Sequence, residues 1–191
     1  MRNRPGPRIV WDLLADRAQP WLSEAGHVPL LIGCDCSVVG GTTQALTRVS
    51  DDVHVLYIDG DFDDAPPDPA QCQSAAAMAV WLITNASPFC AGPRLRPSQV
   101  TVLGWSKPSR LQEGRVNSVS LADIRRDGAA QSTREALAAI PASGRILVHF
   151  DIDVLADSEL PAAYFPHTEG LTVEQLSEVL GLVLRISGRD S

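Results

Sequence analysis

The chain has 191 residues, 45% of them hydrophobic and 20% charged, and its formal net charge is −7, which indicates one globular domain with a buried core. The negative charge argues against nucleic acid and anionic membranes as partners, and no apolar run reaches the roughly 18 residues of a membrane span. The first residues lack the apolar core of a signal peptide, so we expect a cytoplasmic protein whose cysteines are reduced, namely Cys34, Cys36, Cys72 and Cys90.

Helix and strand patterns alternate along the chain. Apolar residues at helical spacing predict a helix over residues 8–26. Further helices are predicted over residues 37–48, over the small residues of 74–84, over the polar residues of 131–140 and from about residue 171 onward. Asp35 or Ser37 is the expected N-cap of the second helix, and Thr172 that of the last. Short apolar runs predict buried strands at residues 28–33, 53–59, 99–104, 116–121 and 145–151. This alternation indicates an α/β fold with a mostly parallel sheet.

Two of these strands end in closely spaced aspartates, which are Asp59, Asp61 and Asp63 in the first case and Asp151 and Asp153 in the second. Residues two apart on a strand point to the same side, and parallel sheets gather their ligands at the carboxyl ends of the strands. If the two strands are neighbours, five carboxylates converge, and protons or cations must neutralise their repulsion. The pattern therefore predicts a pair of divalent metals. The alternative is that these aspartates cap turns and helices.

Cys36 adds a sulfur donor to the predicted metal site. It follows the predicted strand at 28–33 and is therefore expected at the same edge of the sheet. Carboxylate oxygens suit Mg²⁺, Mn²⁺ or Ca²⁺, and a single thiolate shifts the preference toward Mn²⁺, Fe²⁺ or Zn²⁺. Cys34, two residues earlier, is interpreted as a packing residue.

Four segments resemble, in order, motifs of the arginase/ureohydrolase family. Residues 31–37 resemble Gly-Gly-Asp-His-Ser, residues 58–63 resemble Asp-Ala-His-x-Asp, residues 149–155 resemble Ser-Phe-Asp-x-Asp-x-Leu-Asp-Pro, and residues 169–172 resemble Gly-Gly-Leu-Thr. The resemblance implies a three-layer α/β/α fold with a mostly parallel sheet. It also implies that residues 1–191 form a single, partial domain that lacks N-terminal and C-terminal elements of the family, including its guanidinium-binding glutamate.

The resemblance further implies a dinuclear site with two Mn²⁺, other divalent metals being possible. One metal is expected on Cys36, Asp59, Asp63 and Asp151, and the other on Asp59, Asp61, Asp151 and Asp153. In the family, a hydroxide that bridges the metals attacks a guanidinium carbon. Asp63 is the expected catalytic residue that orients this hydroxide and passes its proton to the leaving amine.

The sequence departs from the family motifs at both histidine ligands, which are replaced by Cys36 and Asp61. Each replacement adds negative charge and weakens the metals as Lewis acids. The cysteine is similar to that of family members that hydrolyse Nω-hydroxy-L-arginine to ornithine and hydroxyurea in antibiotic biosynthesis. A hydroxyguanidine is less basic than a guanidine, so its more reactive neutral form is commoner. We therefore expect a C–N hydrolase with a small guanidino-type substrate, and a homo-oligomer.

Histidines elsewhere are candidates for moving protons. The family's proton-shuttling histidine has no counterpart in residues 73–78. His149, two residues before Asp151, is the candidate replacement, and the alternative is a histidine that only hydrogen-bonds a neighbouring carboxylate. His167 is a weaker candidate for contact with the substrate.

Two other functions fit part of the pattern. A catalytically silent subunit would keep the metal ligands and lack turnover. A haloacid-dehalogenase-type phosphatase would use Asp59 and Asp61 as nucleophile and acid, with Mg²⁺ and Lys107, the single lysine of the chain.

Overall fold

Four strands form one parallel sheet in the computed structural model, which describes residues 6–24, 26–33, 35–68, 70–87, 92, 94–107 and 116–187. They are β1 (Val53–Ile58), β2 (Val100–Leu103), β3 (Asn117–Val119) and β4 (Arg145–Phe150), and their order in the sheet is β3-β2-β1-β4. Ile58 at the end of β1 pairs with Leu103 on one side and with Phe150 on the other. The segments that follow β1 and β4 therefore leave the sheet side by side.

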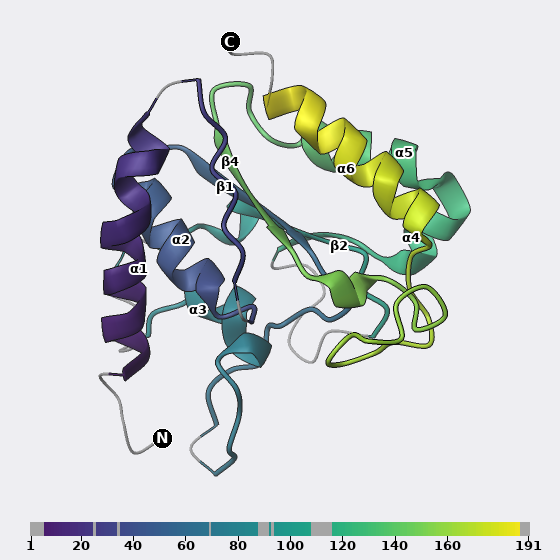
Figure 1. The fold of residues 1–191 in the computed structure, drawn as a ribbon, viewed down its shortest axis with the longest axis horizontal. Helices are drawn as coiled ribbons and strands as arrows, with labels where there is room; N and C mark the ends of the chain where they lie inside the picture. Colours follow the sequence, from purple (N-terminus) through teal and green to yellow (C-terminus); the bar gives the residue numbers. More distant parts are fainter. Residues whose placement is uncertain are drawn as a thin grey trace.

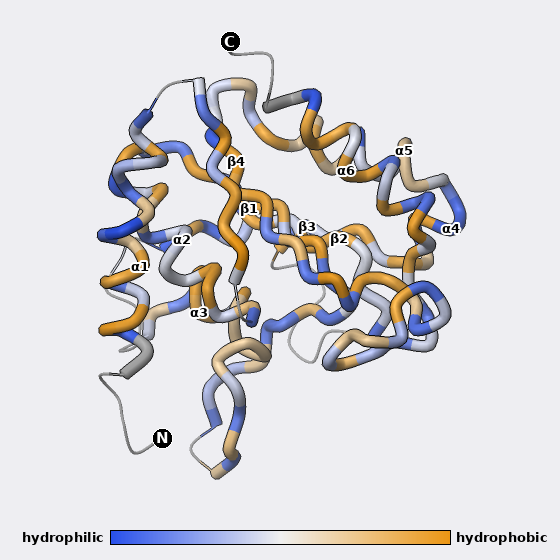
Figure 2. The backbone as a smooth tube through the Cα atoms, viewed as in Figure 1, coloured by the Kyte–Doolittle hydropathy of each residue, from blue (hydrophilic) through white to orange (hydrophobic). Residues whose placement is uncertain are grey.

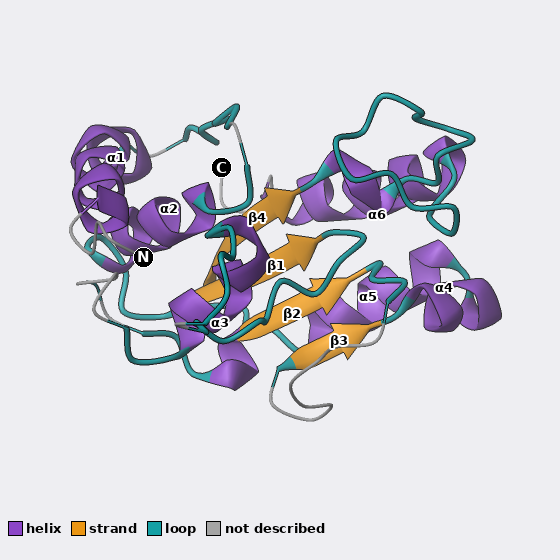
Figure 3. Cartoon of the chain, turned by 90° about the horizontal axis from the view of Figure 1, so that it is seen from below, coloured by secondary structure: helices purple, strands orange, loops and turns teal. Residues whose placement is uncertain are grey.

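Helices cover both faces of this sheet (Figure 1), as the alternation of sequence patterns predicts. One face carries α1 (Gly6–Ser23), α2 (Val38–Thr47) and α3 (Ala79–Thr84); the other carries α4 (Leu121–Asp127), α5 (Ala129–Ala138) and α6 (Val173–Ser187). Short 3-10 turns lie at Ala76–Met78, Pro97–Gln99 and Ile152–Val154. Figure 3 shows the four strands pointing in the same direction between the two helical layers. The predicted three-layer α/β/α fold with a parallel sheet is confirmed.

Strand β1 is the centre of the core because its side chains are buried on both faces. Val55 and Tyr57 pack in the cluster that contains α2 and α3, and Leu56 and Ile58 pack in the cluster that contains α5 and α6. Figure 2 shows the strands as a hydrophobic layer between helices with mixed surfaces. An apolar run without alternation is the pattern of a strand covered on both sides.

We expect Leu56→Ala to lower the free energy of unfolding by about 2–5 kcal/mol, because the side chain is fully buried and the change leaves a cavity. Urea denaturation followed by circular dichroism measures this loss. Leu184→Ala is the control, since Leu184 on α6 is 65% exposed and should change stability by less than about 0.5 kcal/mol. Equal effects of the two changes would contradict the burial of β1.

Most predicted elements occur within a few residues of their expected positions. Thr172 caps the last helix as predicted: its hydroxyl accepts the backbone N–H of Gln175 at 3.1 Å, and the Gln175 side chain accepts the backbone N–H of Thr172 at 3.0 Å. Ser37 stands at the N-cap of α2 but makes no capping bond, and its backbone N–H instead donates to Asp35 at 2.8 Å. Helix α4 was not predicted, although Ser120 and Asp123 form a capping box at its start.

The predicted strand at 28–33 is wrong. These residues form no described strand pairing, and Leu30 and Ile32 are 88% and 89% exposed. An apolar run indicates burial only where another element covers it, and no described strand lies on that side of β4. Strand β4 is accordingly an edge strand, and its residues are partly exposed where those of β1 are buried. Among the described helices, none has the length and apolar character that a membrane crossing needs.

Candidate metal centre

The two aspartate motifs meet at the carboxyl ends of β1 and β4. The backbone N–H of Asp59 donates to Leu103 at 3.1 Å, and that of Asp151 donates to Ile58 at 2.9 Å, so each aspartate extends the ladder of its strand by one residue. Two residues earlier in each strand, Tyr57 and His149 are register partners, and their rings stack with centroids 4.3 Å apart. Both carboxylates therefore start from rigid backbone at one edge of the sheet.

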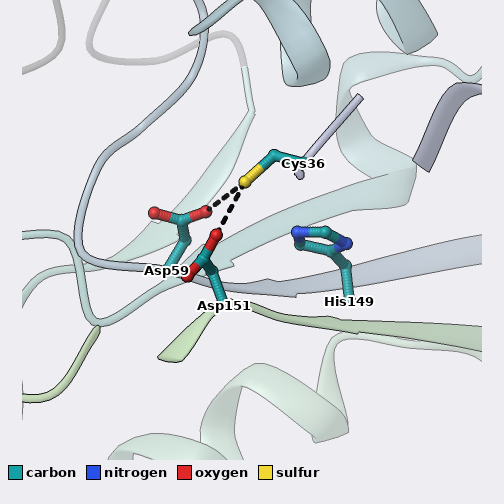
Figure 4. A group of neighbouring side chains, drawn as sticks. All are labelled: Cys36, Asp59, His149 and Asp151. Carbon is teal, nitrogen blue, oxygen red and sulfur yellow. Dashed lines mark hydrogen bonds between the residues drawn. The ribbon is translucent and has the colours of Figure 1, made fainter. Parts of the chain in front are cut away.

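The first group of possible ligands, here the Cys36 group, consists of Cys36, Asp59, His149 and Asp151, with one donor atom from each residue within 4.8 Å of the others. Cys36 lies at the turn before α2, and its thiol donates to Asp151 at 2.9 Å and to Asp59 at 3.5 Å. Figure 4 shows the sulfur facing both carboxylates, with the imidazole of His149 beside them. Three elements thus contribute to one small volume.

The second group, here the His167 group, consists of Asp61, Asp153 and His167, again with donor atoms within 4.8 Å of one another. Backbone N–H groups orient the carboxylates around it: Asp61 donates to Asp59 at 2.7 Å, and Gly60 donates to Asp153 at 3.1 Å. The second of these hydrogen bonds links the two motifs across the sheet edge.

Asp63 lies beside the Cys36 group but belongs to neither set of possible ligands. Its backbone has φ of 50°, in the left-handed region that few residues other than glycine adopt. Its carboxylate accepts the hydroxyl proton of Tyr57 at 2.7 Å, and its carbonyl accepts the backbone N–H of Val80 at 3.0 Å. The turn after β1 thus directs the side chain of Asp63 back toward the strand.

Burial and mutual repulsion raise the pKa values of the carboxyl groups. Burial, followed by the charges of Asp63 and Asp153, raises the pKa of Asp59 well above its ordinary value. Burial raises the pKa of Asp63 to about 7 although hydrogen bonds from Tyr57 and Cys36 lower it. Burial and the charge of Asp151 likewise raise the pKa of Asp153.

Burial also shifts the pKa values of the thiol and of one imidazole in the cluster. Burial, followed by the charges of Asp59 and Asp63, raises the pKa of the Cys36 thiol, which keeps its proton and donates it to the carboxylates. Burial lowers the pKa of His149 to about 4, so its imidazole is neutral at pH 7. A neutral imidazole is the form that ligates metals or accepts a proton.

Positive charge within the described protein does not balance this cluster. Lys107, with its side chain 63% exposed, lies 3.5 Å from Asp61, and no arginine of the described ranges pairs with any of the five aspartates of the two motifs. Buried carboxylates without cationic partners are costly unless they bind protons or metal ions. The donors, five carboxylates with one thiol and two imidazoles, fit a pair of divalent cations.

The structure brings five of the six predicted ligands into the two groups, namely Cys36, Asp59, Asp61, Asp151 and Asp153, and leaves Asp63 beside them. His149 lies in the Cys36 group, as its position before Asp151 suggested. His167, expected near the substrate, is buried against Asp61 and Asp153. Of the four cysteines, Cys36 and Cys72 are free thiols, and Cys34 and Cys90 lie outside the described residues.

A model of the arginase family matches residues 7–190. The chain belongs to the arginase family. This membership argues against the haloacid-dehalogenase alternative, which assigns the chain to a different family.

Known proteins similar to this arginase-family chain are longer. The N(omega)-hydroxy-L-arginine amidinohydrolase of Streptomyces lavendulae is 27% identical over 138 residues, which are 72% of this chain and 50% of that protein. The chain thus spans about half the length of the curated relative it matches.

Solved structures share the fold at low sequence identity. Arginase from Bacillus cereus has a TM-score of 0.80 at 20% identity, covering 98% of this chain and 68% of that one. Entamoeba histolytica arginase in complex with L-ornithine has a TM-score of 0.82 at 16% identity, covering 95% and 66%. Formimidoylglutamase from Bacillus subtilis has a TM-score of 0.76 at 19% identity, covering 91% and 54%.

Proposed function

We propose that this protein is a metal-dependent amidinohydrolase that uses two Mn²⁺ and cleaves the C–N bond of a guanidino or hydroxyguanidino group. The preferred substrate is Nω-hydroxy-L-arginine, which with water gives ornithine and hydroxyurea. The observation that carries the proposal is the convergence of carboxylates, a thiol and imidazoles at two adjacent strand ends of an arginase-family chain. A homo-oligomeric state and a cytoplasmic location remain predictions.

Cys36, Asp59, Asp63 and Asp151 would hold one cation, and Asp59, Asp61, Asp151 and Asp153 the other. When bound, the cations would neutralise the carboxylates and lower the pKa of a water molecule that attacks the guanidino carbon. The thiol of Cys36 would lose its proton on binding, because a cation at this position reverses the effect of the carboxylates on its pKa.

Two residues are proposed to move protons. Asp63, whose carboxyl pKa is about 7 in the metal-free protein, is fixed by the Tyr57 hydroxyl and would accept the proton of the attacking water and pass it to the leaving amine. His149 is the second proposed residue because its buried Nε2 lies in the Cys36 group without a hydrogen-bond partner. Its low pKa means that it would release readily any proton that it received.

The choice of a hydroxyguanidine rests on the charge of the ligands. Cys36 and Asp61 add negative charge where the similar family motifs have histidine, and more anionic ligands make weaker Lewis acids. A less basic substrate keeps more of its neutral form near pH 7, and its carbon is easier to attack. The similarity to the Streptomyces lavendulae enzyme supports the same substrate class.

We expect turnover of Nω-hydroxy-L-arginine to exceed that of L-arginine and agmatine in the presence of Mn²⁺. Hydroxyurea and urea can be measured by colorimetry and confirmed by mass spectrometry, with the chelator-treated protein as the control. Equal or faster turnover of arginine would contradict the preference for a hydroxyguanidine. Bound metal without turnover of any guanidino compound would instead support the silent subunit.

A further inference from the structure

His167 is a buried histidine whose ring nitrogens have no hydrogen-bond partner. The residue is 3% exposed, and both Nδ1 and Nε2 are buried and unpaired. Buried polar atoms are nearly always satisfied, and each unsatisfied one costs about 1–3 kcal/mol. Such an atom in a cluster of carboxylates indicates a missing binding partner.

The backbone holds this side chain in place. His167 forms a β-bridge with Ala156, and its carbonyl accepts the backbone N–H of Asp157 at 2.7 Å. The ring packs directly on Gly60, where an added Cβ would lie 2.5 Å from Cδ2 and 2.8 Å from Nε2 of His167. The turn after β1 therefore needs glycine at this position to leave room for the imidazole.

The distances within the His167 group suit one cation. Nε2 lies 3.5 Å from Asp61 and 3.7 Å from Asp153, which is too long for good hydrogen bonds. Metal–ligand bonds of about 2.1 Å separate neighbouring octahedral ligands by about 3.0 Å and opposite ligands by about 4.2 Å. Two donors of one ion can therefore be at most about 4.2 Å apart, and both observed separations are within this limit.

We propose that His167 is a direct ligand of the metal ion held by Asp61 and Asp153. This inference rests on the metal-binding part of the proposed function and not on its substrate. The imidazole supplies a nitrogen donor without adding negative charge to a group that already contains two carboxylates. Bonding to the ion also gives the buried Nε2 its partner.

The test compares metal binding by His167→Ala and His167→Gln with that of the unchanged protein. We expect the unchanged chain to retain about two Mn²⁺ per chain by elemental analysis after desalting. Both variants should retain about one, with the affinity for the second ion reduced by about 100-fold or more in calorimetric titration. Urea denaturation of the metal-free variants verifies that they fold.

Co²⁺ identifies which ion is lost. A thiolate bound to Co²⁺ gives a charge-transfer band in the near ultraviolet, so loss of the ion at Cys36 would abolish it. The band should persist in both His167 variants and disappear in Cys36→Ser. His54→Ala is the matched control, since His54 is also buried but pairs with Asp52 at the opposite end of β1; it should retain both ions.

Unchanged Mn²⁺ content and affinity in folded His167 variants would overturn the inference and leave the proposed hydrolase function intact. The inference would also be overturned if His54→Ala lost as much metal as His167→Ala. Metal loss confined to the His167 variants supports the inference even if no guanidino compound is turned over, in which case only the proposed function fails.

Discussion

In the absence of divalent metal, the free energy of unfolding is expected to fall as the pH rises from 6.5 to 8, by on the order of 2 kcal/mol. Asp59 and Asp63 have raised pKa values in the folded chain because they are buried, and in the unfolded chain they are ionised throughout this interval. The folded state therefore binds more protons than the unfolded state. Each such proton costs about 1.4 kcal/mol of stability per pH unit.

His149 changes the free energy of unfolding in the opposite direction at lower pH, so the measurement begins at pH 6.5. Burial lowers its pKa from 6.5 to about 4, so the unfolded chain binds the extra proton and stability increases as the pH rises between these values. That increase is largely complete at pH 6.5, where the histidine of the unfolded chain also loses its proton. Above pH 6.5 the carboxyl groups determine the slope.

Saturating Mn²⁺ should reverse this slope. Metal binding displaces the protons, so affinity increases with pH, and an ion at about 100 times its Kd adds about 2.7 kcal/mol. Urea denaturation at pH 6.5 and 8, with chelator and with Mn²⁺, measures all four stabilities. A chelated protein that becomes more stable toward pH 8 would show that the aspartates are not crowded as described.

Asp59→Asn should have opposite effects on metal binding and on the stability of the metal-free protein. Asp59 is 1% exposed and stands between Cys36 and the Asp61 backbone. The change removes a carboxylate that both cations are proposed to share, so we expect Mn²⁺ affinity and turnover to fall by at least about 100-fold.

The metal-free variant should be more stable than the unchanged chain at pH 8, by on the order of 2 kcal/mol. The amide is neutral, so it needs no proton to be buried, and its oxygen can still accept the backbone N–H of Asp61. Calorimetric Mn²⁺ titration and urea denaturation with chelator measure the two effects. Asp51→Asn, an exposed change at the other end of β1, is the control and should alter neither quantity. A destabilised metal-free Asp59→Asn protein would contradict the proposed repulsion.

The sheet and the convergence of the two aspartate motifs could be predicted from the sequence because both depend on local patterns. Strands β1 and β4 are mostly apolar runs, and the aspartates that follow them must emerge at the same edge if the strands are parallel neighbours. The resemblance to the family motifs then indicated which residues of this chain correspond to the metal ligands of the family. Periodicity, the alternation of helix and strand patterns, and motif order are all properties that a single sequence contains.

Other parts of the site depend on contacts that leave no local pattern. His167 lies in an irregular loop, and its bridge to Ala156 and its packing on Gly60 hold it beside Asp153. The direction of Asp63 follows from a left-handed turn and from the hydroxyl of Tyr57. The segment at 28–33 failed as a predicted strand for a related reason: an apolar run does not show which strand it pairs with, and these residues pair with no described strand.

Because β4 is an edge strand of the described sheet, the backbone of Asp151 is held by fewer strand pairings than that of Asp59. Asp59 continues a strand that has neighbours on both sides, whereas Asp151 continues one that has a neighbour on one side only among the described residues. The unpaired backbone groups of an edge strand can hydrogen-bond to a further strand. A segment that paired with β4 in this way would make the backbone that carries Asp151 more rigid. A strand that paired with this edge of β4 would therefore restrict the movement of Asp151 relative to Asp59.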